Sequence, residues 1–126
     1  SCAKLNLNTL TETELTSTIP NFASRMVREF FEYRPYVSIQ QFRQEIGKYV
    51  DDAQTAAYEQ YVFVPVNRNE SDANTLMQIP GVDDALAATL IANRPYATQQ
   101  AFVDALGESL NAEQLAQASC YLVAES

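Results

Sequence analysis

The sequence contains no histidine and no tryptophan, and it has only three glycines and two cysteines among its 126 residues. Without histidine it lacks the commonest general base, the commonest metal ligand and the base of Ser/His and Cys/His nucleophile pairs. Two cysteines alone cannot form a metal site. We therefore expect a non-enzymatic protein with no metal and no cofactor.

Positive charge is also scarce. Eight Lys and Arg residues face sixteen Asp and Glu residues, so the formal net charge is −8. An acidic surface favours solubility and repels nucleic acid and anionic lipid. No apolar run approaches the roughly 18 residues of a membrane-spanning helix. Hydrophobic residues make up 47% of the chain, which is enough for a folded core.

What the sequence does contain is an internal repeat. A shift of 60 aligns residues 19–63 with 79–123 without a gap and gives 11 identities over these 45 positions, where chance gives roughly 3. The identities include Ile19-Pro20 with Ile79-Pro80, Arg34-Pro35-Tyr36 with Arg94-Pro95-Tyr96, and Gly47 with Gly107. Upstream, Leu5-Asn6-Leu7-Asn8 matches Val64-Pro65-Val66-Asn67 at a shift of 59. The chain is therefore divided into two copies, residues 1–63 and 64–126.

Each copy has the pattern of four helices. Asn8 and Asn67 are expected to cap the first helix, Thr11 and Glu14 to form a capping box, and the proline after Ile19 or Ile79 to end that helix. The second helix carries an apolar stripe and ends at Arg-Pro. The stripe comprises Met26, Val27, Phe30 and Phe31 in the first copy, and Leu86, Leu90 and Ile91 in the second.

The last two helices have clear start signals. Ser38 and Thr98 are expected to cap a third helix that ends at Gly47 or Gly107. Asp51 and Asn111 are expected to start a fourth helix that runs to about Val62 or Leu122. The β-rich segment Tyr61–Val66 is predicted to be a helix end and connector. The fold class is therefore all-α.

The order of motifs in each copy resembles one known unit. Leu-Asn-Leu-Asn, a helix, Ile-Pro-Gly-Val, a second helix, Arg-Pro-Tyr and Ser/Thr-x-x-x-Phe occur in this order. The pattern resembles the helix-hairpin-helix domain of competence DNA receptors of the ComEA type, and it is similar to the photosystem II extrinsic subunit PsbU, which shares the module. The resemblance implies two tandem helix-hairpin-helix repeats, packed as one pseudo-two-fold, SAM-domain-like bundle. It also implies DNA contact through the hairpin between the first two helices, typically Pro-Gly-Ile-Gly.

Both hairpins depart from that pattern. The first, Pro20-Asn21-Phe22-Ala23, keeps neither glycine but has Arg25 and Arg28 nearby. The second, Pro80-Gly81-Val82-Asp83, keeps one glycine and places an acid where a phosphate would dock. Since phosphate neutralisation supplies most non-specific DNA affinity, we expect a module that binds another protein. DNA binding through the hairpins is the alternative.

Other residues have a functional and a structural interpretation. Arg34 and Arg94 could bind an anion, but their position favours capping of the preceding helix. Tyr36 and Tyr96 are expected to pack between helices with the hydroxyl at the rim. Asp51-Asp52 and Asp83-Asp84 could be catalytic or metal-binding carboxylate pairs, but acids are expected at helix starts. Phe22 is expected in the core. The protein-binding interpretation also predicts an exposed apolar patch, around Phe22 or the tyrosine-rich end of the first copy, which consists of Tyr49, Tyr58 and Tyr61.

The two cysteines bear on location. If the copies pack about a closed two-fold, Cys2 and Cys120 approach each other and can form a disulfide. The alternatives are a lipid-bearing Cys2 with a lone Cys120, or two reduced thiols in a cytoplasmic protein. A chain that begins at Ser1 suggests processing, so we expect an exported protein that is periplasmic, extracellular or lipid-anchored through Cys2.

Overall fold

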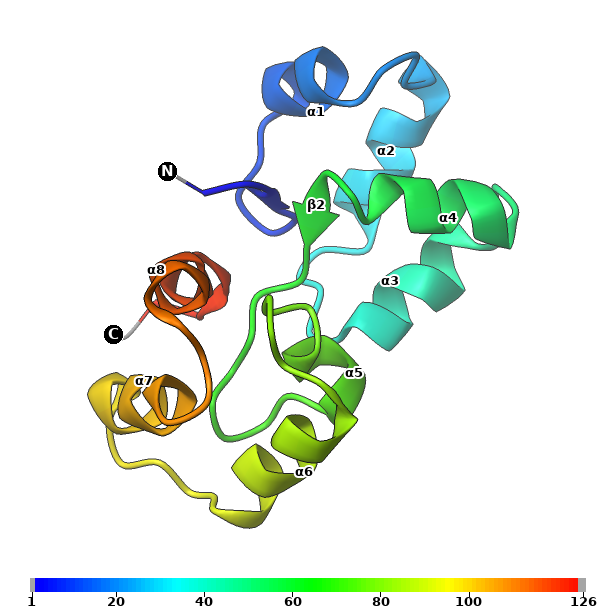
Figure 1. The fold of residues 1–126 in the computed structure, drawn as a ribbon. Coiled ribbons are helices and arrows are strands. Elements are labelled where there is room, and N and C mark those ends of the chain that lie inside the picture. The colour runs from blue at the N-terminus through cyan, green and yellow to red at the C-terminus, as the bar shows by residue number, and fades with distance from the viewer. Residues whose placement is uncertain (1, 125–126) are drawn as a thin grey trace. The chain divides into compact units, whose positions relative to one another are not determined.

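The computed structural model describes residues 2–124 and is mostly helical. The chain divides into two compact units, one from Cys2 to Val64 and one from Pro65 onward. The first unit comprises β1 (Leu5–Asn6), α1 (Glu12–Thr18), α2 (Ser24–Glu32), α3 (Ile39–Ile46), α4 (Asp52–Tyr58) and β2 (Val62–Phe63). The second comprises α5 (Ala73–Leu76), α6 (Asp84–Ala92), α7 (Gln99–Gly107) and α8 (Ala112–Tyr121) (Figure 1). None of the described helices is long and apolar enough to cross a membrane.

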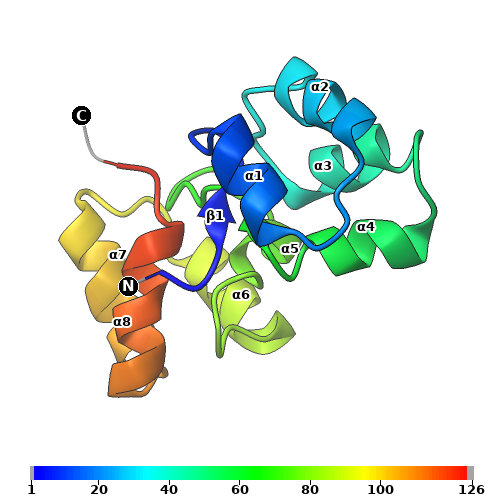
Figure 2. The same ribbon diagram turned by 90° about the horizontal axis from the view of Figure 1, so that it is seen from above.

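In the first unit, α1 packs against α2, α3 packs against α4, and β1 pairs with β2 in parallel. Figure 2 shows this unit from above, with β1 joined to α1 by a short loop. Its core is a cluster of apolar side chains that these elements bury together: Leu7, Leu10, Leu15, Ile19, Met26, Phe30, Tyr36, Ile39, Phe42, Ile46, Tyr58, Val62 and Val64. Burial of this apolar surface is what holds such short helices in place, since helices of seven to nine residues are unstable alone.

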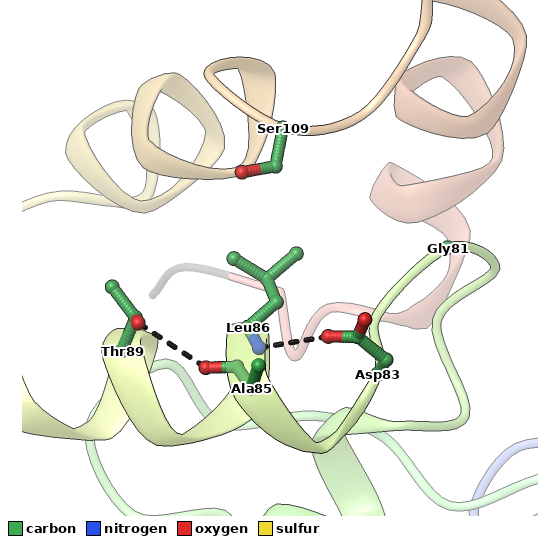
Figure 3. Close-up of a pocket in the computed structure, with 6 residues that line it drawn as sticks. All are labelled: Gly81, Asp83, Ala85, Leu86, Thr89 and Ser109. Carbon is green, nitrogen blue, oxygen red and sulfur yellow. Dashed lines mark hydrogen bonds between the residues drawn. The ribbon is translucent and has the colours of Figure 1, made fainter.

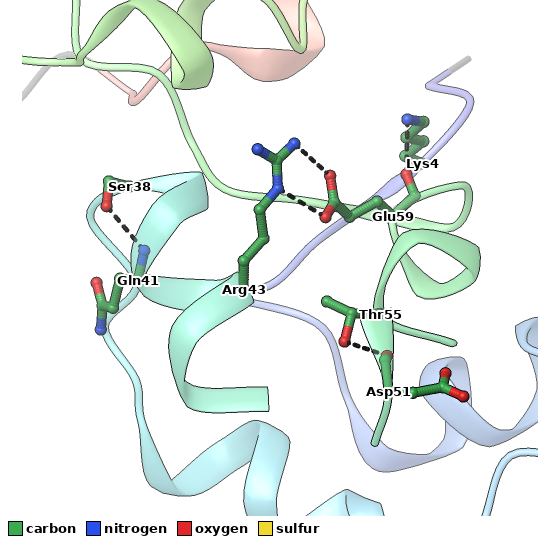
Figure 4. A network of polar contacts seen from close by, with 7 residues as sticks. All are labelled: Lys4, Ser38, Gln41, Arg43, Asp51, Thr55 and Glu59. Atoms are coloured by element: carbon green, nitrogen blue, oxygen red, sulfur yellow. Dashed lines mark hydrogen bonds and ion pairs between the residues drawn. The ribbon is translucent and has the colours of Figure 1, made fainter. Parts of the chain in front are cut away.

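Polar contacts also connect the last helices of the first unit (Figure 4). Both guanidinium nitrogens Nε and Nη2 of Arg43 on α3 lie within 3.0 Å of the Glu59 carboxylate, which follows α4. The Lys4 ammonium donates to the Glu59 carbonyl oxygen at 2.7 Å, which brings the residue before β1 to the same point. A bidentate Arg–carboxylate pair fixes the orientation of both side chains.

Several predicted helix boundaries are confirmed. The side chains of Ser38, Thr98, Asp51 and Asn111 accept hydrogen bonds from amides in the first turns of α3, α7, α4 and α8. Thr11 and Glu14 form the predicted capping box. Gly47 caps the end of α3, and α7 ends at Gly107.

The prediction for the start of the first helix in each unit is wrong. Thr11 caps α1 and Asp72 caps α5, so neither Asn8 nor Asn67 is an N-cap. The Asn8 side chain instead binds the backbone N–H and C=O of Tyr36, and Asn69 binds those of Tyr96 in the same way. Asn8 therefore corresponds to Asn69, and the shift upstream is 61 rather than 59. The second unit has one residue fewer between these points, since buried Leu15 matches Leu76 at the shift of 61 whereas Ile19 matches Ile79 at the shift of 60.

The segment Tyr61–Val66 is not only a connector. Leu5 pairs with Val62 in β1–β2, and Val66 pairs with Leu122 in an isolated parallel bridge. For this reason α4 ends at Tyr58, before the predicted Val62. Strand pairing depends on a distant partner segment, which a search for local periodicity does not detect.

Candidate functional site

The first hairpin is built around a left-handed residue. Asn21 has a φ of +56°, a conformation that asparagine tolerates better than most residues. The ring of Phe22 then turns inward and packs edge-on against Phe30 and Tyr58, with centroids 5.1 and 5.5 Å apart. Ala23 is the N-cap of α2 and has no side chain that can cap it. This helix therefore begins without the side-chain acceptor that the other long helices have.

The second hairpin has the same turn with different chemistry. Gly81 has a φ of +90°, and the Val82 amide donates to the Ile79 carbonyl oxygen at 3.0 Å. Val82 is buried. The Asp83 carboxylate accepts from the Leu86 amide at 2.8 Å, as Figure 3 shows, and so occupies the start of α6 itself.

The charges at the two hairpins are opposite. Arg25 and Arg28 are both exposed on α2, beside the first hairpin. Asp83 and Asp84 are both exposed at the second. The first hairpin therefore offers an uncapped helix start with cations, which suits an anion, and the second offers carboxylates, which suit a cation.

The chain matches no protein-family model, no curated protein and no solved structure.

The two arginines before proline do not cap the preceding helix, which corrects the prediction. The Arg34 guanidinium donates to the carbonyl oxygens of Leu7 and Leu10, both at 2.6 Å. In the second unit Arg94 donates to the carbonyls of Arg68 and Ser71. These arginines hold the turn that leads into the first helix of their own unit. Both Arg-Pro peptide bonds are cis.

The tyrosines that follow are buried more deeply than predicted. Tyr36 and Tyr96 are 1% and 8% exposed, and their hydroxyls donate to the carbonyls of Phe30 and Leu90, each at 2.8 Å. The hydroxyls therefore do not lie at the rim. Burial raises the pKa of both phenols. Asp51 and Asp83, the first acid of each pair, are N-caps.

The exposed apolar patch that the protein-binding interpretation predicts is not found at Phe22 or Tyr58. Phe22 packs against the core and Tyr58 is 4% exposed. Within residues 2–124 the exposed large apolar side chains are Val37, Tyr49 and Val123. Tyr49 is engaged, because its hydroxyl lies 2.7 Å from that of Tyr33. In the part of the chain that the structure describes, Phe22 and Tyr58 therefore do not expose the predicted apolar patch.

A groove lies beside the second hairpin, and the sequence did not point to it. It has a volume of about 390 Å³ and is lined by Gly81, Asp83, Ala85, Leu86, Thr89 and Ser109. In Figure 3 the Leu86 side chain points toward Ser109, which lies across the gap on the segment after α7. The signal that could have revealed it is the replacement of Tyr49 by Ser109 at matching positions of the repeat.

Both cysteines, Cys2 and Cys120, are disulfide-bonded. By the repeat, Cys120 corresponds to Gln60 at the shift of 60, and Cys2 corresponds to Phe63 at the corrected shift of 61, not to Tyr61 as the shift of 59 would give. A disulfide is compatible with an oxidising compartment.

Proposed function

We propose that the chain is a non-enzymatic binding module, made of two helix-hairpin-helix units, that contacts another protein outside the cytoplasm. One observation carries the proposal: at the second hairpin the Asp83 carboxylate accepts a hydrogen bond from the Leu86 amide. A phosphate would need that amide and would meet the charges of Asp83 and Asp84. The assignment of helix-hairpin-helix units rests on the resemblance to ComEA-type receptors and PsbU. The disulfide favours an exported location.

Site-specific photo-crosslinking tests this function. A photoreactive phenylalanine is introduced in place of exposed Asp84 at the second hairpin, and in place of exposed Thr16 on α1 as the matched control. In cells of the source organism we expect one protein species crosslinked through position 84 and absent at position 16. The purified species should then bind the unmodified chain with a measurable Kd. Absence of such a species, or equal crosslinking from both positions, would overturn the proposal.

DNA binding is the second candidate, and the first hairpin favours it. Asn21 adopts the left-handed backbone that a glycine would provide, Ala23 leaves the start of α2 without a side-chain cap, and Arg25 and Arg28 lie exposed beside it. These features are those of an anion site at a helix start.

A titration of labelled duplex DNA separates the two candidates. Under the proposed function we expect no saturable binding at about 50 mM salt, because the net charge of −8 repels the duplex. Saturable binding that weakens steeply with salt, and that is lost in Arg25→Ala/Arg28→Ala but kept in Arg43→Ala, would establish the DNA function instead.

A further inference from the structure

The groove of the second unit lies at a place that the first unit fills with its own side chain. Ser109 and Tyr49 have the same backbone contacts: their amides donate to the carbonyls of Leu106 and Ile46, each at 3.0 Å. Helices α2 and α6 have the same length, and their C-caps Tyr33 and Asn93 have nearly the same φ and ψ. The two positions are therefore equivalent in backbone and differ in side chain.

In the first unit a tyrosine lies across α2. The Tyr49 and Tyr33 rings are 6.4 Å apart, and hydrogen bonds to Tyr33 and Glu29 raise the pKa of Tyr49. Lys48 lies over the Tyr33 ring, 5.5 Å from its centroid, and pairs with Glu45 at 2.9 Å. Tyr49 therefore has a lysine as its neighbour in sequence. The carboxylate of Glu45 pairs with this lysine, and that of Glu29 accepts a hydrogen bond from Tyr49.

In the second unit the side chains that would make these contacts are replaced by smaller ones. Ser109 replaces Tyr49, Thr89 replaces Glu29, and Asn93 replaces Tyr33. Ala85, which lines the groove, replaces Arg25 and so also has the smaller side chain. Leu86 is partly exposed and lines the groove, whereas its counterpart Met26 is fully buried. The groove therefore has an apolar side chain in its lining, and none of the residues that line it is aromatic.

The charge around the groove has also reversed. Glu108 stands where the first unit has Lys48, and Asp83 lines the groove itself. An incoming side chain would meet an apolar surface at Leu86, hydroxyls at Thr89 and Ser109, and nearby carboxylates. Aromatic rings with a polar tip suit a site that is apolar at one end and wet at the other. A cation next to the ring would complement the acids.

We propose that this groove binds an aromatic side chain of a partner protein, supplied by a segment that carries a lysine or arginine beside a tyrosine. The inference rests on the proposed protein-binding function and identifies the chemistry of the partner segment. Such a segment would reproduce, between two proteins, the Lys48–Tyr49 arrangement that the first unit makes within itself.

The test uses a defined peptide with the full-length, ¹⁵N-labelled protein. Acetyl-Gly-Lys-Tyr-Val-amide is titrated to millimolar concentration while amide chemical shifts are followed by NMR. We expect saturable shifts centred on Gly81, Leu86, Thr89 and Ser109. The peptide with alanine in place of tyrosine should lose these shifts, and the peptide with glutamate in place of lysine should bind about tenfold more weakly, a change of about 1.4 kcal/mol. Shifts that are absent, or equal for all three peptides, would overturn the proposal.

Variants of the groove supply the second test. Ser109→Tyr restores the side chain that the equivalent backbone already accommodates at Tyr49, so it should fill the groove and abolish peptide binding. Ser109→Ala, the matched control, should leave binding unchanged. Ala85→Arg introduces the residue of the first unit and should repel the basic peptide. Binding that persists in both Ser109→Tyr and Ala85→Arg would overturn the proposal even if one variant is unstable.

The same variants separate this inference from the proposed function. If a partner captured by crosslinking binds Ser109→Tyr about tenfold more weakly than Ser109→Ala, the groove is its docking site. If it binds both equally, the groove proposal is overturned and the protein-binding function stands. If no partner is captured, the proposed function fails on its own evidence, and the docking proposal that depends on it is overturned too.

Discussion

Asn21 and Gly81 occupy the same place in the two hairpins and share a left-handed backbone, with φ angles of +56° and +90°. A side chain with a Cβ is strained there, and asparagine less so than most. Asn21→Gly should therefore leave the free energy of unfolding within a few tenths of a kcal/mol, whereas Asn21→Ala should lower it by about 1 kcal/mol. Urea unfolding followed by circular dichroism measures both. Equal stability of the two variants would show that this turn does not require its asparagine.

Gly81 should be less tolerant than Asn21. A Cβ at Gly81 would lie 2.7 Å from Gln114 Nε2 and 2.7 Å from Leu110 Cδ2, in addition to the strain of a positive φ. Gly81→Ala should cost about 1–3 kcal/mol in urea unfolding. The matched control is Gly107→Ala, since a Cβ there meets Leu115 Cδ2 only at 3.5 Å. A smaller loss for Gly81→Ala than for Gly107→Ala would contradict the role of the turn.

The buried tyrosine hydroxyls should contribute to stability. Removal of the donor in Tyr36→Phe or Tyr96→Phe ends the bond to the Phe30 or Leu90 carbonyl and should lower the free energy of unfolding by about 1 kcal/mol. Tyr61→Phe, at a half-buried side chain, should have a smaller effect. Thermal and urea unfolding both report the difference. Unchanged stability of both buried variants would mean that the hydrogen bond of each hydroxyl only offsets the free-energy cost of removing that hydroxyl from water.

Alkaline pH should destabilise the protein through the same side chains. Burial raises the pKa of Tyr36, Tyr58, Tyr96 and Tyr121 above the usual value of 10.0. The unfolded chain then loses these phenol protons at lower pH than the folded chain. The contribution of the protonated tyrosines to the free energy of unfolding is therefore intact below about pH 10 and is lost as the pH rises above it. The free energy of unfolding should fall between about pH 10 and 12, and less steeply in Tyr36→Phe. A flat profile over that range would contradict the assigned burial.

The two hairpins should respond in opposite ways to a change of cap. Asp83→Ala removes the bond to the Leu86 amide and should cost about 1 kcal/mol, whereas Ala23→Asp supplies the missing acceptor to α2 and should stabilise by up to about 1 kcal/mol. The extended backbone of Ala23, with φ −68° and ψ 127°, suits a capping residue. Urea midpoints of the two variants check both signs. A loss of stability in Ala23→Asp would indicate that the start of α2 does not accept a carboxylate.

Reduction should weaken the fold. The disulfide closes a loop that includes most of the chain, and in the chain-entropy model such a loop contributes about 4–5 kcal/mol at most. Addition of a reductant should lower the urea midpoint of the native protein. The double variant Cys2→Ser/Cys120→Ser should start at the lower midpoint and should not respond to reductant. Identical midpoints before and after complete reduction would show that the bond does not stabilise the folded state.

The sequence determined much of the local structure. Ser38, Thr98, Asp51 and Asn111 are caps as predicted, and helices end near Gly47 and Gly107, because each of these features needs only a side chain and the amides within one turn of it. The internal repeat was likewise visible, since it depends on residue identity alone. The all-α class follows from these signals, and the structure bears it out in being mostly helical.

Tertiary structure decided the rest. Arg34 binds carbonyls 24 and 27 residues earlier in the chain, and Asn8 binds Tyr36 rather than capping a helix. Strand β2 and its pairing with β1 depend on segments that only folding brings near. The groove beside Gly81 depends on the distance between α6 and Ser109. Such features arise from pairs of residues far apart in sequence, and the local rules that place a cap or a turn contain no information about which distant group will be the partner.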